Sequence, residues 1–139
     1  MAEGTAEGKV AFELVAPERV LTASAVDMVV VPGAGGDFGV LPQHSLLMSV
    51  VRPGVIETFQ GDTVEQRIFV AGGFAEVNET SCTVLAEEAM LVDRIDLETA
   101  RRRLANARDD LSEAKDDVER SRLEREIEIA EAMIAAGGG

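Results

Sequence analysis

The chain has 139 residues, of which 46% are hydrophobic, and its formal net charge is −13. This length suits one average domain or two small ones. The acidic balance argues against nucleic acid and against direct docking onto anionic lipid, because both require clustered Lys and Arg. Since no stretch approaches the about 20 apolar residues of a membrane span, we expect no direct membrane insertion.

The N-terminal segment and the single cysteine favour a reducing, cytosolic setting in a prokaryote, although an organelle-encoded protein would also lack a targeting signal. Cys82 has no second cysteine with which to form an internal disulfide, and its apolar neighbours favour a small buried hydrophobe over a nucleophile. Residues 1–9 carry neither the apolar core of a secretory signal nor the acid-poor, Arg-rich pattern of a transit peptide. We expect them to be disordered.

The first two thirds of the chain have the composition of a β domain. All four prolines and ten of the 13 glycines precede residue 93. Short apolar runs between turn signals predict strands at Val10–Val15, Arg19–Ala25, Val26–Val31, Val55–Gln60, Thr63–Val70, Ala71–Val77 and Ser81–Ala86. Gly61-Asp62 suits a type II′ hairpin turn. Many short strands at close spacing predict a sandwich or flattened barrel over residues 10–92.

The most unusual segment is Pro32–His44, which reads Pro-Gly-Ala-Gly-Gly-Asp-Phe-Gly-Val-Leu-Pro-Gln-His. Four glycines and two prolines exclude a helix and disfavour a regular strand. We therefore expect a shaped loop with a histidine at its exit. It lacks the lysine and the strand–loop–helix setting of a phosphate-binding loop.

Residues 93–139 are predicted to be helical, because 96–136 are rich in Ala, Arg, Glu and Leu without a breaker. Two apolar stripes with a phase change between them favour an antiparallel helical hairpin that turns near Lys115–Asp117. The stripes are Leu97, Ala100, Leu104, Ala107, Leu111, Ala114 and Val118, then Leu123, Ile127, Ala130 and Ile134. One unbroken helix is the alternative, since neither Gly nor Pro marks the turn.

Such a hairpin buries little area by itself, so we expect it to be marginally stable and movable unless it docks. Eight of the 13 basic residues follow residue 95. A solvated face with internal ion pairs, such as Glu98 with Arg102, is one interpretation. A basic strip that meets an acidic protein surface is the other.

Groups for catalysis are sparse. One histidine and one cysteine cannot assemble a protein metal site. Ser45, His44 and Asp37 could be written as a hydrolytic triad, but no nucleophile elbow accompanies them. We therefore expect no enzyme activity and no cofactor for the chain alone.

The chain resembles the epsilon-subunit family of bacterial F-type ATP synthases, whose mitochondrial counterpart is called delta. The matching segments, in order, are Phe12–Glu18, Val29–Gly33, Gly36–His44, Arg52–Gly54, Val70–Val77 and Thr83–Glu87. The resemblance implies a ten-stranded β-sandwich followed by a two-helix domain. It also implies a noncatalytic rotor subunit that packs on gamma, touches the c-ring and lies at the cytoplasmic face of the inner membrane.

By position, the resemblance implies a rotor interface at Asp37, Phe38 and His44. The family's ATP-binding motif, Ile/Leu-Asp-x-x-Arg-Ala, reads Ile95-Asp96-Leu97-Glu98-Thr99-Ala100 here. Thr99 cannot replace the bidentate, charged phosphate contact of arginine, so weak or absent ATP binding is expected. Asp96 then serves as a helix N-cap.

The resemblance also implies that the helical domain can reach the alpha and beta subunits and restrain ATP hydrolysis. The candidate contacts are Arg101, Arg102, Arg108, Arg122 and Arg125. Two other functions stay open on sequence: a stand-alone adaptor built from a sandwich and a helical hairpin, and, far behind, a small hydrolase using Ser45 and His44.

Overall fold

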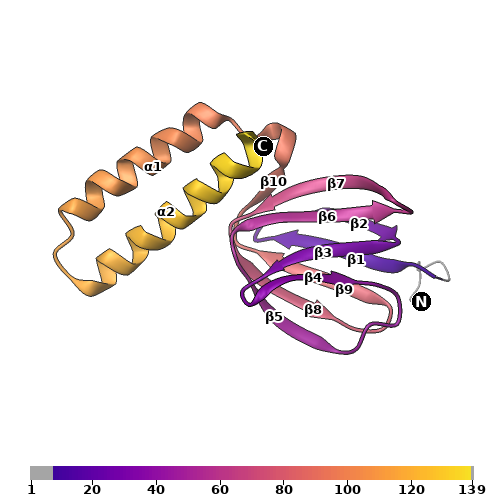
Figure 1. Cartoon of the computed structure of the whole chain (residues 1–139). Helices are drawn as coiled ribbons and strands as arrows, with labels where there is room; N and C mark the ends of the chain where they lie inside the picture. The colour runs from indigo at the N-terminus through magenta and orange to yellow at the C-terminus, as the bar shows by residue number, and fades with distance from the viewer. Residues whose placement is uncertain (1–7, 139) are drawn as a thin grey trace.

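The computed structural model describes residues 8–138, which form ten strands followed by a 3₁₀ turn and two helices (Figure 1). The elements are β1 (Val10–Ala16), β2 (Arg19–Val26), β3 (Met28–Gly33), β4 (Gly36–Val40), β5 (Leu47–Val51), β6 (Gly54–Gln60), β7 (Thr63–Val70), β8 (Gly73–Val77), β9 (Ser81–Ala86), β10 (Ala89–Leu91), η1 (Val92–Arg94), α1 (Leu97–Ser112) and α2 (Asp117–Gly138). The ten-stranded sandwich with a helical hairpin is confirmed.

The strands follow the order β10-β7-β6-β3-β5-β8-β9-β1-β2, with β4 paired to β3 alone. Neighbours are antiparallel except β1 and β9, which run parallel. At one side of the sandwich the layers meet where Gly33 of β3 pairs with Val51 of β5. At the other side β2 and β10 end the order, and among the described residues no ladder joins them.

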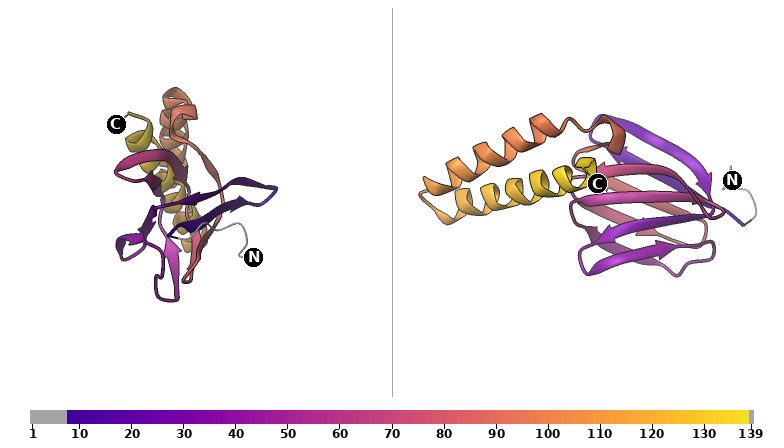
Figure 2. Two further views of the ribbon diagram at one scale, coloured as in Figure 1. Left: turned by 90° about the vertical axis from the view of Figure 1, so that its right-hand side faces the viewer. Right: turned by 45° about the horizontal axis from the view of Figure 1, so that its top comes forward.

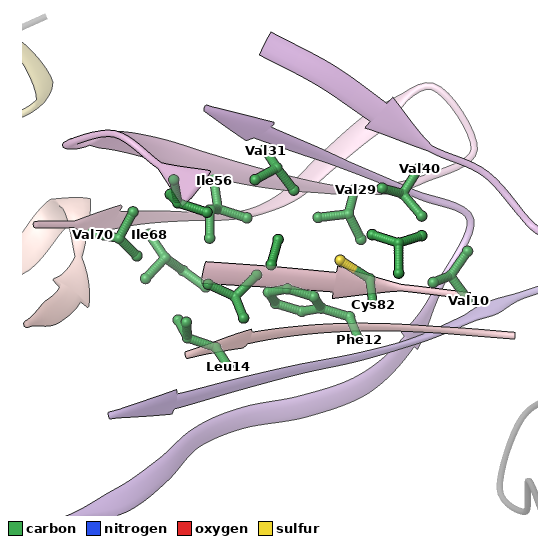
Figure 3. Packing of buried hydrophobic residues seen from close by; sticks show 14 of the residues in the cluster. Val10, Phe12, Leu14, Val29, Val31, Val40, Ile56, Ile68, Val70 and Cys82 are labelled. Atoms are coloured by element: carbon green, nitrogen blue, oxygen red, sulfur yellow. The ribbon is translucent and has the colours of Figure 1, made fainter. Parts of the chain in front are cut away.

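The core lies between the two layers. Alternate side chains of β1, namely Val10, Phe12 and Leu14, are fully buried, as the two-residue period of a strand requires. Figure 3 shows them pointing toward Val29, Ile56 and other apolar residues of the opposite layer. Cys82 belongs to this cluster, and burial raises the pKa of its thiol to about 12, which agrees with a structural cysteine.

The expectation that Pro32–His44 forms a loop throughout is wrong. Pro32 and Gly33 end β3, Ala34 and Gly35 turn, and Gly36–Val40 returns as β4. The glycines permit this pairing because the chains approach closely: a Cβ on Gly33 would lie 2.8 Å from the carbonyl oxygen of Gly36 and 2.9 Å from the ring of Phe38. Only residues 41–44, after β4, are irregular.

Turn chemistry explains two other junctions. Gly61 has φ +62°, and Asp62 keeps a negative φ, as the predicted type II′ turn between β6 and β7 requires. The strands β5 and β10 have no counterpart among the runs predicted from residue patterns. The long expected strand at Ala71–Val77 begins only at Gly73.

The helices form an antiparallel hairpin, so the unbroken-helix alternative is wrong. Two side-chain caps replace a glycine turn: the Glu119 amide donates to Asp116 Oδ1 at 2.8 Å, and the Lys115 amide donates to Glu119 Oε1 at 3.2 Å. Because the chain turns before Val118, that residue is 82% exposed and does not continue the stripe of α1.

The hairpin projects from one end of the sandwich, opposite the end where the described chain begins (Figures 1 and 2). Its base is packed on the sandwich through a second apolar cluster. The fully or nearly buried members are Phe69, Ala71, Ala100, Ile129, Met133 and Ala136. The hairpin is therefore docked in this structure.

Two terminal features complete the description. The expected disordered segment 1–9 lies largely outside the described residues; Lys9, which is described, pairs with Asp27 at 2.8 Å. Neither described helix combines the length and apolarity needed to cross a bilayer.

Candidate protein-interaction site

Asp37 lies at the start of β4, on the end of the sandwich that carries the hairpin. Its carboxylate accepts a hydrogen bond from Arg52 Nη2 at 2.5 Å, and Arg52 Nη1 donates to the Gly33 carbonyl at 2.6 Å. The Asp37 side chain keeps 60% of its surface exposed. The arginine therefore fixes the β3–β4 turn and partly neutralises the predicted acidic contact.

Phe38 and His44 have different surroundings from Asp37. Phe38 is half-buried and packs against the main core. His44 is also half-buried, and its Nδ1 donates to the main-chain oxygen of Ser45 at 2.6 Å. This hydrogen bond does not involve the Ser45 hydroxyl, which a hydrolytic triad would use as its nucleophile.

The structure does not bring Asp37 and His44 together. Asp37 pairs with Pro32 near the hairpin end of β3, whereas β4 runs away from that end until Val40 pairs with Val29. His44 follows in the connection to β5, beside the β8–β9 turn, where the Gln43 amide donates to the Glu79 carbonyl at 2.8 Å. The separation leaves the hydrolytic triad unassembled and divides the predicted interface between two ends of the sandwich.

Residue-pattern reasoning missed a large apolar surface on the outside of the layer β5-β8-β9. Met48, Val50, Phe74 and Leu85 are 72%, 52%, 55% and 55% exposed. Register places Val50 opposite Phe74, and Phe74 opposite Leu85, so these three side chains form one row across three strands. Met48 lies on β5 two residues before Val50, on the same face. We call these four residues the outer patch.

A groove borders the outer patch, and the sequence of β5 contains a pattern that indicates the patch. A groove of about 390 Å³ runs between β1, β8 and β9 and is lined by Val15, Pro17, Phe74 and Leu85 among others. The pattern is that of Leu47–Val51, which is β5: apolar residues occupy both faces of this strand instead of alternating with polar ones. Clustered exposed apolar side chains mark interaction sites on soluble proteins.

The residues of the degenerate nucleotide motif have local structural roles. Asp96 caps α1: its Oδ1 accepts from the Glu98 and Thr99 amides, and its Oδ2 accepts from the Thr99 hydroxyl at 3.0 Å. These hydrogen bonds, that of the Thr99 hydroxyl first, lower the pKa of Asp96. Ala100 is fully buried in the cluster beneath the hairpin.

Arg103 was absent from the predicted contacts, yet it joins three elements. Its guanidinium lies 3.0 Å from Glu88, in the β9–β10 turn, and 2.8 Å from Glu126 of α2. Burial disfavours its charged form, but hydrogen bonds and charge from the two glutamates outweigh burial and raise the pKa of Arg103. Only 28% of this side chain is exposed, which favours a structural contact.

The predicted regulatory arginines are mostly paired inside the chain. Arg125 contacts Glu87 at 2.5 Å and Arg108 contacts Glu131 at 3.1 Å. The expected pair of Arg102 with Glu98 is present, at 3.9 Å. Within residues 8–138, Arg101 and Arg122 make no ion pair. The structure thus favours internal ion pairing for most of the basic strip.

Comparison with known proteins agrees with this architecture. Residues 9–92 match the family described as ATP synthase, Delta/Epsilon chain, beta-sandwich domain. The ATP synthase epsilon chain of Rhodospirillum rubrum is 53% identical over 128 residues, covering 92% of this chain and 96% of that protein. The ATP synthase epsilon chain of Maricaulis maris is 52% identical over 127 residues, covering 91% and 95%.

A solved structure extends the likeness to both parts of the chain. One chain of the Euglena gracilis mitochondrial ATP synthase, OSCP/F1/c-ring, superposes with a TM-score of 0.78 at 26% identity, covering 96% of this chain and 84% of that one. The β order, the docked hairpin and these similarities lead to one conclusion: the chain belongs to the ATP synthase delta/epsilon family.

Proposed function

We propose that this chain is a noncatalytic central-stalk subunit of an F-type ATP synthase, which couples c-ring rotation to ATP synthesis. Family membership supports this role, as does the likeness to a chain of a complex that includes F1 and a c-ring. The outer patch carries the proposal, because a rotor subunit must dock firmly on the shaft that it turns with.

The gamma subunit is the proposed occupant of the outer patch. A docked partner removes apolar surface from water at about 25 cal/mol per Å², and Phe74 lies at the centre of the row. Buried aromatic residues at the centre of an interface dominate its energetics. Asp37 and His44 remain proposed contacts to the rotor, with Asp37 directed to a basic c-ring loop.

Residues 10–92 would form the rotor-binding domain and 93–139 a regulatory domain. The docked hairpin supports a resting role for this second domain. Its release must break the ion pairs to Glu87 and Glu88 together with the apolar packing on Phe69 and Ala71. The complex would place the subunit peripherally at the cytoplasmic face of the bacterial inner membrane.

Docking is tested by Phe74→Asp, with Val20→Asp as the matched control. Val20 is 52% exposed and Phe74 is 55% exposed, but Val20 lies on β2, outside the outer patch. We expect Phe74→Asp to abolish copurification with gamma and to lower coupled ATP synthesis, while Val20→Asp retains both. Equal retention in the two variants would contradict the docking face, and failure of the unmodified chain to copurify would favour an adaptor function.

Regulation is tested by Arg103→Gln in the assembled complex. Removing residues 96–139 would expose Phe69 and Ala71, so a variant that loosens the hairpin is the cleaner probe. If the released hairpin restrains hydrolysis, ATPase activity falls in this variant relative to Arg102→Gln. Equal ATPase activity in both variants would contradict the regulatory role.

A further inference from the structure

A pocket lies at the open side of the sandwich, where the strand order ends. It has a volume of about 340 Å³ and is lined by residues of β2, β7, β10 and η1. These residues are Arg19, Leu21, Thr22, Gln66, Ile68, Met90, Leu91 and Arg94. The volume is at the lower end of small-molecule sites.

Two arginines line this pocket, Arg19 and Arg94. Neither Arg19 nor Arg94 makes an ion pair or a side-chain hydrogen bond with residues 8–138. This contrasts with most other arginines of a chain in which 26 acidic residues face 13 basic ones. Convergent guanidinium groups select carboxylates and phosphates, which they can hold with paired hydrogen bonds.

The rest of the lining is largely apolar. Ile68 is 1% exposed and Leu21 packs on the main core, while Met90 packs on the cluster beneath the hairpin. Between these residues, the Thr22 hydroxyl of β2 donates to Gln66 Oε1 of β7 at 3.4 Å. An inorganic anion would leave the apolar part of this lining uncovered, whereas an acid with a short alkyl chain would use both parts.

We propose that this pocket binds a small anionic amphiphile, namely a medium-chain carboxylic acid. Its carboxylate lies between Arg19 and Arg94. Its alkyl chain lies against Leu21, Met90 and Leu91. This inference concerns a different surface from the outer patch, and it does not depend on the proposed function.

Ligand binding at this pocket would also steady the hairpin. Arg19 belongs to β2 of the sandwich, whereas Arg94 ends η1 in the connection from β10 to α1. Val92 and Ile95 of the same connection pack on the cluster beneath the hairpin. A carboxylate held by both arginines therefore ties this connection to β2.

The test uses octanoate and the isolated full chain, with binding followed by calorimetry and amide NMR shifts. We expect saturable binding, with shifts concentrated at β2, β7 and β10. Arg19→Gln and Arg94→Gln should each weaken binding by about tenfold or more, because each removes a charged hydrogen-bond donor. Arg67→Gln is the matched control: Arg67 lies on β7 between the lining residues Gln66 and Ile68, but it pairs with Glu57 and does not line the pocket.

Neutral octanol and inorganic phosphate separate the two parts of the ligand, and both should bind at least about tenfold more weakly than octanoate. At ten times its Kd, octanoate should reduce hairpin opening, seen as amide exchange in α2, by about tenfold. No saturable octanoate binding, shifts elsewhere on the protein, or equal binding of octanol or phosphate would overturn the proposal. Unchanged exchange in α2 would overturn the link to the hairpin.

Discussion

Arg103→Gln should loosen the hairpin from the sandwich without unfolding the strands. Arg103 contacts Glu88 of the sandwich and Glu126 of α2, and its side chain is only 28% exposed. Because solvent still reaches these carboxylates and screens the charges, each contact contributes only about 0.5–1 kcal/mol to the stability of the docked hairpin. The Glu88 contact is lost when the hairpin leaves the sandwich, which is an about 2- to 5-fold rise in the open population. The Glu126 contact joins α1 to α2 and is lost only where the hairpin itself comes apart, so losing both costs about 1–2 kcal/mol, an about 5- to 30-fold rise.

Arg102→Gln is the matched control on the same helix. Its contact to Glu98 is 3.9 Å long, and the two side chains are 63% and 83% exposed. Such a pair contributes at most about 0.5 kcal/mol, so hairpin opening should change by about twofold or less.

The assay is native-state amide exchange at low denaturant, which reports opening of each element separately. We expect faster exchange in α1 and α2 of Arg103→Gln, unchanged exchange in β1 and β9, and a smaller difference in 1 M salt. The reasoning is refuted if the two variants exchange alike, or if the strands of Arg103→Gln open as much as its helices.

Three further predictions concern single residues. Asp37→Lys should lower coupled ATP synthesis. If the carboxylate faces a c-ring loop, the double variant that exchanges the two charges, Asp37→Arg with Arg52→Asp, should remain impaired. Full recovery of ATP synthesis in the double variant would mean that Asp37 only holds Arg52 beside Gly33. Asp96→Ala should lower the urea midpoint at pH 7. Because hydrogen bonds depress the folded pKa of Asp96 below its ordinary 3.8, the capping contribution is present above that value and is lost as pH falls through the folded pKa, so the two proteins should converge in acid; a constant difference down to pH 2 would be inconsistent with capping. ATP should show no submillimolar binding to the isolated chain by calorimetry, since Thr99 donates to Asp96 and carries no charge.

Much of the architecture followed from local patterns. A short apolar run closed by a turn signal placed β1, and the change in composition near residue 93 separated a β part from a helical part. Asp96 was identified as a cap because an acid before a helix satisfies free amides. These features depend on neighbours in sequence, which is why one sequence sufficed.

The remaining features depend on partners far along the chain. Pro32–His44 was misassigned because its glycines permit close strand pairing as well as a loop, and only the approach of Phe38 to Gly33 distinguishes the two. The outer patch required β5 to be placed beside β8, a pairing of residues that are 22 or more positions apart. Nothing in the local sequence distinguishes Arg103 from other surface arginines, because its partners Glu88 and Glu126 lie 15 and 23 residues away along the chain.

The most direct test of the central claim is photocrosslinking from position 74 in the assembled ATP synthase. A photoreactive amino acid would replace Phe74 in one variant and Val20 in the other, since the two side chains are similarly exposed. The account predicts a crosslink to gamma from position 74 and none from position 20. A gamma crosslink from position 20 alone, or none from either position in an intact complex, would contradict docking through the outer patch.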